Sequence, residues 1–388
     1  MWKHIASNAL TLLVLALFAA GGLIAWGQRQ YTGPGPLADP VCLMIERGAS
    51  LRQVSADLEA EGALERPAIF RIGADYENKS GQVKFGSYLI PAGASMQEIV
   101  AIITEGGRST CGTEVNFRIG VTTAEVLVRE LDPATNRYAE VMSFEPGAAE
   151  PPADYAEVAA RQDVRFRVTL AEGVTSWQVV EELKFAEFLE GEVAELPAEG
   201  SLAPDSYEVE RGDDRAALVA EMAARQAAIL AELWQRRQDG LPYESPQEAM
   251  IMASIVEKET GLPEERPLVA SVFINRLRQG MKLQTDPTVI YGITDGKAPL
   301  SRGLRQSELR RETPYNTYLI DGLPPTPIAN PGRESIAAAL NPASSDFLFF
   351  VADGTGGHAF ARTLAEHNAN VARWRQIEAD RERQQGNP

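Results

Sequence analysis

The N-terminal segment constrains this chain most, because residues 5–26 contain no charged side chain. The run from Leu10 to Ile24 is strongly apolar and is long enough to cross a hydrocarbon core as a helix. A cleavable signal peptide is the alternative, since Ala19-Ala20 could serve a peptidase. Signal-peptide apolar regions are shorter, however, and here the apolar character continues to Trp26, an interfacial aromatic. We therefore expect a membrane anchor.

The anchor has few flanking charges from which to read its orientation. Lys3 precedes it and favours a cytoplasmic N-terminus. Residues 1–30 are thus expected to form a cytoplasmic tip and a single transmembrane helix. Residues 31–40 follow with three prolines and two glycines, which predicts an extended linker.

The acidic composition limits the possible partners. The 388 residues carry a formal net charge of −17, and 44% of them are hydrophobic. Binding to nucleic-acid phosphates requires surfaces rich in Lys and Arg, so we expect no nucleic-acid partner. The hydrophobic content is typical of a globular protein with a buried core.

Cysteine and histidine are scarce in this sequence. Cys42 and Cys111 are the two cysteines, and His4, His358 and His367 are the three histidines. This is too few for a cysteine-based zinc or iron–sulfur site, and we expect neither a metal nor a cofactor. In an oxidising compartment the two cysteines could pair, and two separate free thiols are an equal alternative.

A pattern of strand, glycine turn, Ser or Thr cap and amphipathic helix recurs along the chain. Its instances lie at residues 45–58, 88–95, 117–123 and 168–183. Such units occur in many α+β domains. The first of them is similar to the glycan-binding LysM module, with a generic packing unit as an equal alternative. We expect a LysM-like strand–helix module over residues 41–115.

Residues 116–244 predict an intermediate α+β region with an insertion. The stretch 132–165 is rich in Pro, Ala and Glu without clear periodicity, which is typical of a long connection. Residues 213–237 contain no Gly or Pro and are rich in helix formers, which predicts a long surface helix. At the C-terminus, residues 376–388 are charged and Gln-rich and are expected to fray.

Residues 245–261 predict a helix with both ends marked. Ser245 is placed to cap the N-terminus, and Glu248 is expected to complete a capping box. Gly261 stands where a left-handed residue would end the helix. One face of this helix is apolar, through Ala249, Met252, Ala253 and Val256.

Glu259 projects from this apolar face, because it follows Ile255 by four residues and Val256 by three. Partial desolvation and the unpaired carbonyls of the last helical turn should both raise the pKa of its carboxyl group. A carboxyl group that holds a proton near neutral pH can protonate the leaving oxygen of a glycosidic bond. The alternative is an ion pair at the helix end, for example with Arg276.

Further elements are expected downstream. A second helix is predicted over residues 265–279, closed by Gly280, and a hairpin from residues 347–351 and 358–361. The loops in this region are rich in Tyr, Asn, Thr, Gln and Asp, which suit the binding of sugars. Polar loops are also common without any ligand.

Long, specific motifs run through this part of the chain, at residues 253–260, 269–277, 283–292, 314–318, 322–325 and 350–354. They closely resemble the YceG-like family of membrane-anchored endolytic murein transglycosylases. The resemblance is strong over residues 245–370 and loose over residues 41–245. It implies a catalytic module over residues 245–375.

The resemblance also implies a reaction. A lytic transglycosylase cleaves the MurNAc–GlcNAc β-1,4 bond of nascent peptidoglycan without water and leaves a 1,6-anhydro-MurNAc end. The family motif assigns Glu259 as the single acid and then base, with Glu257 as a possible auxiliary. The residues that would hold the sugars or the carboxyl group are Gln284, Thr285, Asp286, Tyr291, Tyr315, Asn316, Thr317, His358 and Phe360. A packing or turn role is an equal alternative for each of these.

We therefore expect an α+β protein with an N-terminal transmembrane helix, a LysM-like module and a mixed α+β catalytic module. The resemblance places it in the inner membrane with its catalytic domain in the periplasm. Glycan strands and the membrane are the expected partners, and peptidoglycan synthases are possible ones. The alternative function is a tethered, non-catalytic scaffold that binds peptidoglycan for wall synthases.

Overall fold

The computed structural model describes residues 2–105, 110–147, 150–161 and 163–385. By their contacts these residues form two compact units. The first unit comprises Met1–Asn116, Leu127–Phe144 and Glu150–Arg165. The second comprises Phe117–Val126, Glu145–Ala149 and Phe166–Pro388. Each unit is described by itself below.

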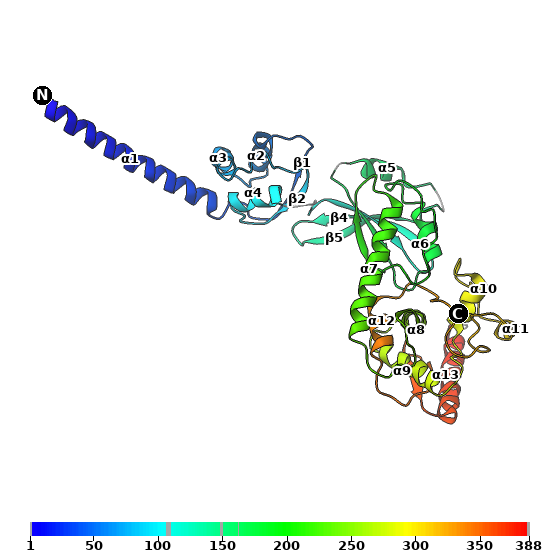
Figure 1. Cartoon of the computed structure of the whole chain (residues 1–388). Coiled ribbons are helices and arrows are strands. Elements are labelled where there is room, and N and C mark those ends of the chain that lie inside the picture. Colours follow the sequence, from blue (N-terminus) through cyan, green and yellow to red (C-terminus); the bar gives the residue numbers. More distant parts are fainter. Residues whose placement is uncertain (1, 106–109, 148–149, 162, 386–388) are drawn as a thin grey trace. The chain divides into compact units, whose positions relative to one another are not determined.

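The first unit begins with helix α1 (Trp2–Thr32), drawn in dark blue in Figure 1. Its segment Leu10–Thr32 contains an 18-residue window with a mean hydropathy of 2.1, and it is long and apolar enough to cross a membrane. The helix continues two residues into the predicted linker. The reason is packing, because the ring of Tyr31 is buried against Gly73, which leaves no room for a side chain there.

A small α/β cluster follows α1. Strand β1 (Val41–Ile45) pairs antiparallel with β2 (Gly86–Ile90). Two helices, α2 (Leu51–Ala60) and α3 (Pro67–Tyr76), lie between them in sequence, and α4 (Met96–Glu105) follows β2. The three helices gather around the strand pair (Figure 1), and the cluster has a hydrophobic core of its own.

A disulfide joins the two cysteines. The sequence alone had left open whether they pair. Cys42 lies on β1, and Cys111 lies just before β3 (Thr113–Ile119). Their Cα atoms are 5.7 Å apart, and the bond closes a sequence separation of 69 residues. It ties the strand pair to the polypeptide that leads out of the cluster.

The recurring strand–turn–helix pattern is confirmed at three of its four instances. Ser50 and Thr175 form capping boxes at the starts of α2 and α6 (Ser176–Leu183). Ser95 caps α4, because its hydroxyl accepts the N–H of Glu98 and its own N–H donates to the Glu98 carboxylate. Side-chain to backbone bonds over three residues thus set these helix starts.

The pattern is wrong at its remaining instance. Residues 117–123 lead from β3 into strand β4 (Ala124–Asp132), not into a helix. Ala124, Val126 and Val128 are buried while the residues between them are half-exposed, and this period of two is that of a strand. The stretch 132–165 is also more ordered than predicted, because it contains β5 (Arg137–Phe144) and α5 (Ala153–Ala160).

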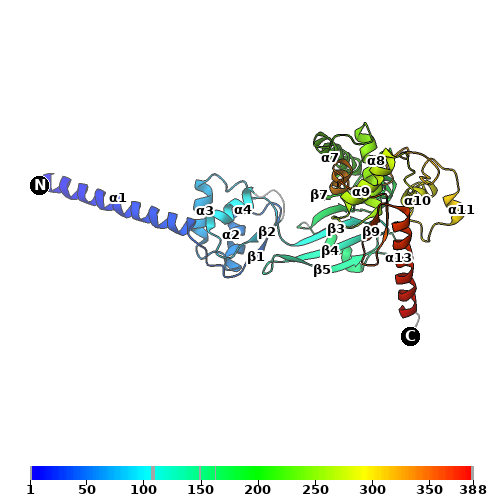
Figure 2. The same ribbon diagram turned by 90° about the horizontal axis from the view of Figure 1, so that it is seen from below.

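The strands from residue 113 onward build a five-stranded sheet in the order β5-β4-β3-β6-β7. Strands β3, β4 and β5 run side by side in Figure 2. Strand β6 (Arg165–Leu170) pairs antiparallel with β7 (Ser206–Val209), with Val168 opposite Tyr207. The inward residues of β6 alternate with half-exposed ones, as a sheet with one buried face requires.

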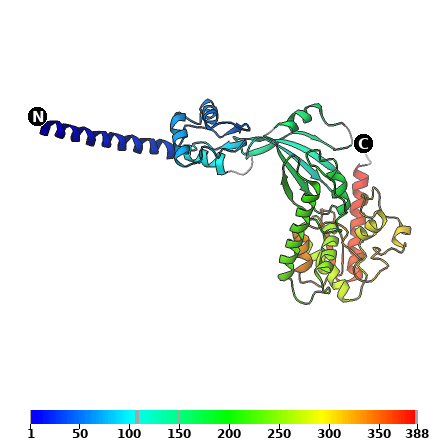
Figure 3. The same ribbon diagram turned by 45° about the horizontal axis from the view of Figure 1, so that its top comes forward.

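Helices dominate the rest of the second unit. The predicted long helix is α7 (Arg215–Gln235), which Asp214 caps. The later elements are α8 (Pro246–Glu259), α9 (Arg266–Arg278), α10 (Asp286–Thr294), α11 (Gln306–Leu309), α12 (Arg333–Leu340), the hairpin β8 (Phe349–Ala352) with β9 (His358–Ala361), and α13 (Leu364–Gln385), red in Figure 3. The predicted helix 265–279 and the hairpin are confirmed. The tail expected to fray lies within α13 as far as Gln385, and residues 386–388 lie outside the described part.

Helix α8 is the centre of this unit. It packs against α7, α9, α10 and α12, and every residue from Ala249 to Val256 is buried. The prediction of one apolar face is therefore wrong, since the helix is covered on all sides. The residues of α8 that are not buried lie in its first turn and in its last turn, which carries Glu257, Lys258 and Glu259.

The two ends of α8 differ from their predicted details. The Ser245 side chain accepts the N–H of Glu248, as expected of a cap. The Glu248 carboxylate bonds to the N–H of Glu244 at 2.7 Å, so the predicted reciprocal bond to Ser245 is not the one formed. Thr260 ends the helix in an extended conformation. Gly261 is not among the residues with positive φ, so the predicted left-handed stop is wrong.

Candidate functional site

Glu259 is the last residue of α8, and its side chain is half-buried. Its Oε1 accepts a hydrogen bond from the hydroxyl of Thr285, which precedes α10. Burial raises the pKa of the Glu259 carboxyl group to about 6, and the Thr285 bond lowers it to a smaller extent. The carboxyl group therefore keeps its proton to a higher pH than an ordinary glutamate does.

Three charged side chains also act on Glu259. The negative charge of Asp286 raises its pKa, while His358 and Arg276 lower it. These groups come from the start of α10, from β9 and from α9. The carboxyl group thus lies where separate parts of the second unit meet.

Arg276 does not form the ion pair that was the alternative for Glu259. Its Nε donates to the carbonyl of Leu348 at 2.7 Å, and its Nη1 donates to that of Leu283 at 2.6 Å. Within the described ranges of the chain, no ion pair joins it to Glu259. Arg276 instead ties α9 to the polypeptide before β8 and before α10.

Glu257 has a different environment although it is only two residues away. Its side chain is 5% exposed. Its Oε2 accepts the N–H of Gly332, the cap residue of α12, at 2.9 Å, and its Oε1 lies 3.5 Å from Nη2 of Arg266. Burial raises the pKa of this carboxyl group as well. Both oxygens are engaged by the protein itself.

The segment before α10 is held against residues 316–317 by a short ladder of hydrogen bonds. The N–H of Gln284 donates to the carbonyl of Thr317 at 3.1 Å. The N–H of Thr285 donates to the Thr317 hydroxyl at 3.0 Å, and this hydroxyl lies 2.9 Å from that of Thr288. Thr285 and Thr317 are both buried. The ladder therefore fixes the hydroxyl that bonds to Glu259.

Gln284 and Asp286 flank Thr285 and are exposed. Gln284 has a φ of 52°, in the left-handed region that a residue with a side chain rarely adopts. Asp286 accepts a hydrogen bond from the hydroxyl of Tyr318 at 2.7 Å. These side chains lie on the accessible side of the segment that carries Thr285.

Asn316 is completely buried, at 0% exposure. Its amide donates to the carbonyl of Arg311 at 2.8 Å, and its side-chain oxygen accepts the N–H of Tyr318 at 3.1 Å. A side chain in this position organises the loop, and it cannot contact a sugar unless the loop opens.

Tyr291 and Tyr315 lie together and bond away from Glu259. Their rings are 4.9 Å apart. The Tyr291 hydroxyl donates to Glu199 at 3.1 Å, and the Tyr315 hydroxyl lies 2.8 Å from that of Thr326. Burial raises the pKa of Glu199 too, so a second protonatable carboxyl group lies at this place.

His358 and Phe360 both stand on β9 and are half-buried. His358 is held by Glu265, which bonds to its backbone N–H and to its Nδ1, each at 2.7 Å. The ring of Phe350 meets the imidazole edge-on at 5.2 Å. Of the two, His358 is the one whose charge reaches Glu259.

Comparison with known proteins decides the family. The sequence profile of the YceG-like family matches residues 43–373, which is most of the chain. This chain belongs to the YceG-like family. The match includes Glu257, Glu259 and the other residues of this candidate site.

Two relatives of this YceG-like chain are called endolytic murein transglycosylase. The one from Bacillus subtilis is 38% identical over 172 residues, 44% of this chain and 46% of that protein. The one from Streptococcus pneumoniae is 26% identical over 386 residues, 95% of this chain and 65% of that protein. The chain thus spans about half to two thirds of the length of the curated relatives it matches.

A solved crystal structure of a YceG-like protein from Listeria monocytogenes is also similar. It shares 24% sequence identity with this chain, with a TM-score of 0.44. The match covers 85% of this chain and 98% of that one.

Sequence reasoning missed three residues of this YceG-like site: Tyr318, Glu265 and Glu199. Tyr318 stands in the motif run 314–318 beside residues that were selected, so its position was a usable signal. Glu265 stands at the start of the predicted helix 265–279, and Glu199 lies in a segment for which no element was predicted. Their roles arise from bonds to His358 and Tyr291, which are 93 and 92 residues away in sequence.

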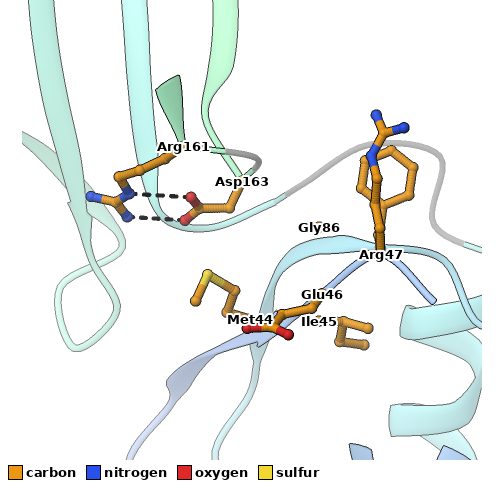
Figure 4. A pocket seen from close by; sticks show the side chains of 8 residues that line it. Met44, Ile45, Glu46, Arg47, Gly86, Arg161 and Asp163 are labelled. Atoms are coloured by element: carbon orange, nitrogen blue, oxygen red, sulfur yellow. Dashed lines mark hydrogen bonds and ion pairs between the residues drawn. The ribbon is translucent and has the colours of Figure 1, made fainter. Parts of the chain in front are cut away.

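Hollows lie elsewhere on the YceG-like chain. Two in the second unit, of about 470 and 400 Å³, share Gln247, Ile251 and Pro325 and follow the N-terminal half of α8. One in the first unit measures about 400 Å³ (Figure 4). In it Arg161 donates two hydrogen bonds to the buried Asp163, and the guanidinium of Arg47 lies 4.1 Å over the ring of Phe85.

Proposed function

We propose that this chain is an endolytic lytic transglycosylase. It cleaves MurNAc–GlcNAc β-1,4 bonds in nascent peptidoglycan and leaves 1,6-anhydro-MurNAc ends. The names of the two relatives support the substrate class. The observation that carries the chemistry is the half-buried carboxyl group of Glu259, with a pKa of about 6 and one hydroxyl partner.

In the proposed reaction one carboxyl group serves twice. Protonated Glu259 first donates its proton to the glycosidic oxygen, so the bond from this oxygen to C1 of MurNAc breaks. The resulting carboxylate then accepts the proton of the MurNAc C6 hydroxyl as O6 bonds to C1. The proton delivered in the first step is recovered in the second, so no water is consumed and the enzyme returns to its initial state. This differs from the paired carboxylates of ordinary glycosidases.

The surrounding side chains have distinct proposed roles. Thr285 holds one oxygen of Glu259, and the other, which has no hydrogen-bond partner among the described residues, would be available for the substrate. Gln284 and Asp286, which are exposed beside it, would contact the sugars, and so would Tyr318 through its ring. Glu257 would support the fold and not the reaction, because both its oxygens are engaged.

We also propose where the reaction takes place. The apolar span Leu10–Thr32 would anchor the chain in the inner membrane, with both units in the periplasm. The disulfide between Cys42 and Cys111 supports an oxidising compartment. The strand–helix–helix–strand order of residues 41–90 supports a LysM-like module that binds glycan, and peptidoglycan synthases would be possible partners.

The test uses the full chain in detergent with un-crosslinked glycan strands. We expect mass analysis of the products to show 1,6-anhydro-MurNAc ends, and Glu259→Gln to abolish them. Glu264→Gln is the matched control, because Glu264 lies five residues further on and is exposed. Ends that persist in the folded Glu259→Gln protein would reject the assignment. Binding of strands without any such ends in the parent protein would favour the scaffold function.

A further inference from the structure

A carboxylate and an imidazole form a tight pair beside the end of α8. Oε1 of Glu265 accepts the backbone N–H of His358, and Oε2 lies 2.7 Å from His358 Nδ1. The same Oε2 accepts the hydroxyl of Thr260 at 3.2 Å, so Glu265 is bonded to the residue that follows Glu259. The side chains of Glu265 and His358 are only 12% and 17% exposed.

The backbone is shaped to allow this pairing. Gly357 precedes His358, and a Cβ atom there would lie 2.7 Å from Oε1 of Glu265. Any side chain at this position would displace the carboxylate. The close approach therefore depends on glycine, and it draws the start of β9 onto the start of α9.

The pairing determines which nitrogen of His358 remains available. A carboxylate can only accept hydrogen bonds, so Nδ1 carries a proton and donates it to Glu265. In the portion of the chain that the structure describes, Nε2 has no hydrogen-bond partner. When Nε2 also takes a proton, the ring becomes a cation that Glu265 holds in place.

Carboxyl groups from three elements interact electrostatically with the imidazole. They are Glu265 at the start of α9, Asp353 in the turn between β8 and β9, and Glu259 at the end of α8. The other charged groups that act on Glu259 are Asp286, with Tyr318 bonded to it, and Arg276, whose donors are bound to carbonyl groups. His358 and Arg276 are therefore the two basic side chains that act on Glu259, and Arg276 is already committed to carbonyl groups.

We propose that Glu265 holds His358 in place, and that His358 is a positioning residue for Glu259. It stabilises the ionised form of Glu259 after Glu259 has delivered its proton. This inference rests on the proposed function. In that reaction the carboxylate of Glu259 exists between the two proton transfers. A fixed positive charge beside it stabilises this state and the transition states that flank it. His358 would act through Glu259 and need not touch the sugar.

The variant that tests this is His358→Asn in the full chain. The Asn amide nitrogen can take the place of Nδ1 and keep the bond to Glu265, while the titrating ring is removed. His367→Asn is the matched control, because His367 stacks on Phe349 at 5.2 Å in the same unit. Glu265→Gln tests the holding group and keeps its size.

Two readouts separate this inference from the proposed function. Carbon-13 NMR of labelled Glu carboxyl groups, with Glu259 identified by its loss in Glu259→Gln, reports the Glu259 titration without any turnover. We expect its midpoint, about 6 in the parent, to move to higher pH in His358→Asn and to stay in place in His367→Asn. In turnover, kcat should fall about tenfold with little change in KM. The alkaline limb of the profile of kcat against pH should move with the NMR midpoint.

An unchanged Glu259 midpoint in the folded His358→Asn protein would overturn the inference. So would a rise in KM with an unchanged kcat, because His358 would then only bind substrate. A parent protein that releases no anhydro ends would reject the proposed function instead, and the NMR result would still decide the coupling between the two residues.

Discussion

The carboxylate of Glu257 accepts the backbone N–H of Gly332 at 2.9 Å, and this bond joins the last turn of α8 to the start of α12. A carboxylate at a helix N-terminus is favoured by the helix dipole. Arg266 lies 3.5 Å from the other oxygen and also bonds to Glu172 at 2.9 Å. The neighbouring acid, Glu259, has no such backbone partner in the described part of the chain. Two acids of one short motif thus have different partners.

We expect Glu257→Ala to destabilise the second unit by about 2–4 kcal/mol, because it removes a buried hydrogen bond and one partner of a buried ion pair. Glu257→Gln should cost less, since its amide oxygen can still accept the Gly332 N–H. Glu264→Ala, at an exposed position, should change the free energy of unfolding by less than about 0.5 kcal/mol. Urea unfolding measures all three. Equal effects of Glu257→Ala and Glu264→Ala would contradict the structural role.

The raised pKa of Glu259 predicts a stability that depends on pH. Its value of about 6 exceeds the ordinary 4.5, so the folded state favours the protonated form. Stability should be lost as the pH rises from 4.5 to 6, by up to about 2 kcal/mol. Glu259→Gln should therefore be the more stable protein at pH 8, and the difference should vanish near pH 4. Unfolding curves at both pH values test this. A variant that is no more stable than the parent at pH 8 would show that burial does not act on this carboxyl group.

Gln284 is exposed and left-handed, at a φ of 52°, next to the hydroxyl that bonds to Glu259. Gln284→Gly should leave the free energy of unfolding within about 1 kcal/mol of the parent, since glycine adopts this conformation readily. If the side chain holds substrate, kcat/KM should fall about threefold to tenfold. Asp295→Gly is the matched control, because Asp295 is also exposed and left-handed, at 51°. The same loss of activity in both variants would rule out a specific contact of Gln284.

The disulfide predicts a redox-sensitive first unit. Closing a separation of 69 residues stabilises a fold by about 2–4 kcal/mol, chiefly by restricting the unfolded chain. We expect reductant to lower the unfolding transition of this unit. The Cys42→Ser, Cys111→Ser double variant should unfold as the reduced protein does and should not respond to reductant. A response of the double variant would place the effect elsewhere.

Local structure was largely predictable from the sequence. The starts of α2, α6 and α8 depend on bonds between a Ser or Thr side chain and a backbone N–H three residues later. The instance at residues 117–123 shows the limit of such patterns. There the alternation of Ala124, Val126 and Val128 outweighed the turn and produced a strand.

The candidate site was predictable only in part. An acid at the end of a buried helix is visible in the sequence, and so Glu259 could be selected. The loop residues were selected together, but tertiary contacts separate them. Thr285 bonds to Glu259, Asn316 is enclosed within its own loop, and Tyr291 turns to Glu199. Residues close together in a motif can face different elements, because each side chain bonds to whatever the fold brings near.

The sequence by itself determined the apolar span, several helix starts and the presence of two acids in the last turn of α8, because these depend on neighbours within a few residues. Only the tertiary structure decided which of the two carboxyl groups has both oxygens bonded to other groups of the protein. Gly332 lies 75 residues from Glu257, and Thr285 lies 26 residues from Glu259. Packing of α12 against α8 brings a backbone N–H to the first acid. The second acid meets a hydroxyl and the charge of His358, and among the described residues its other oxygen has no hydrogen-bond partner.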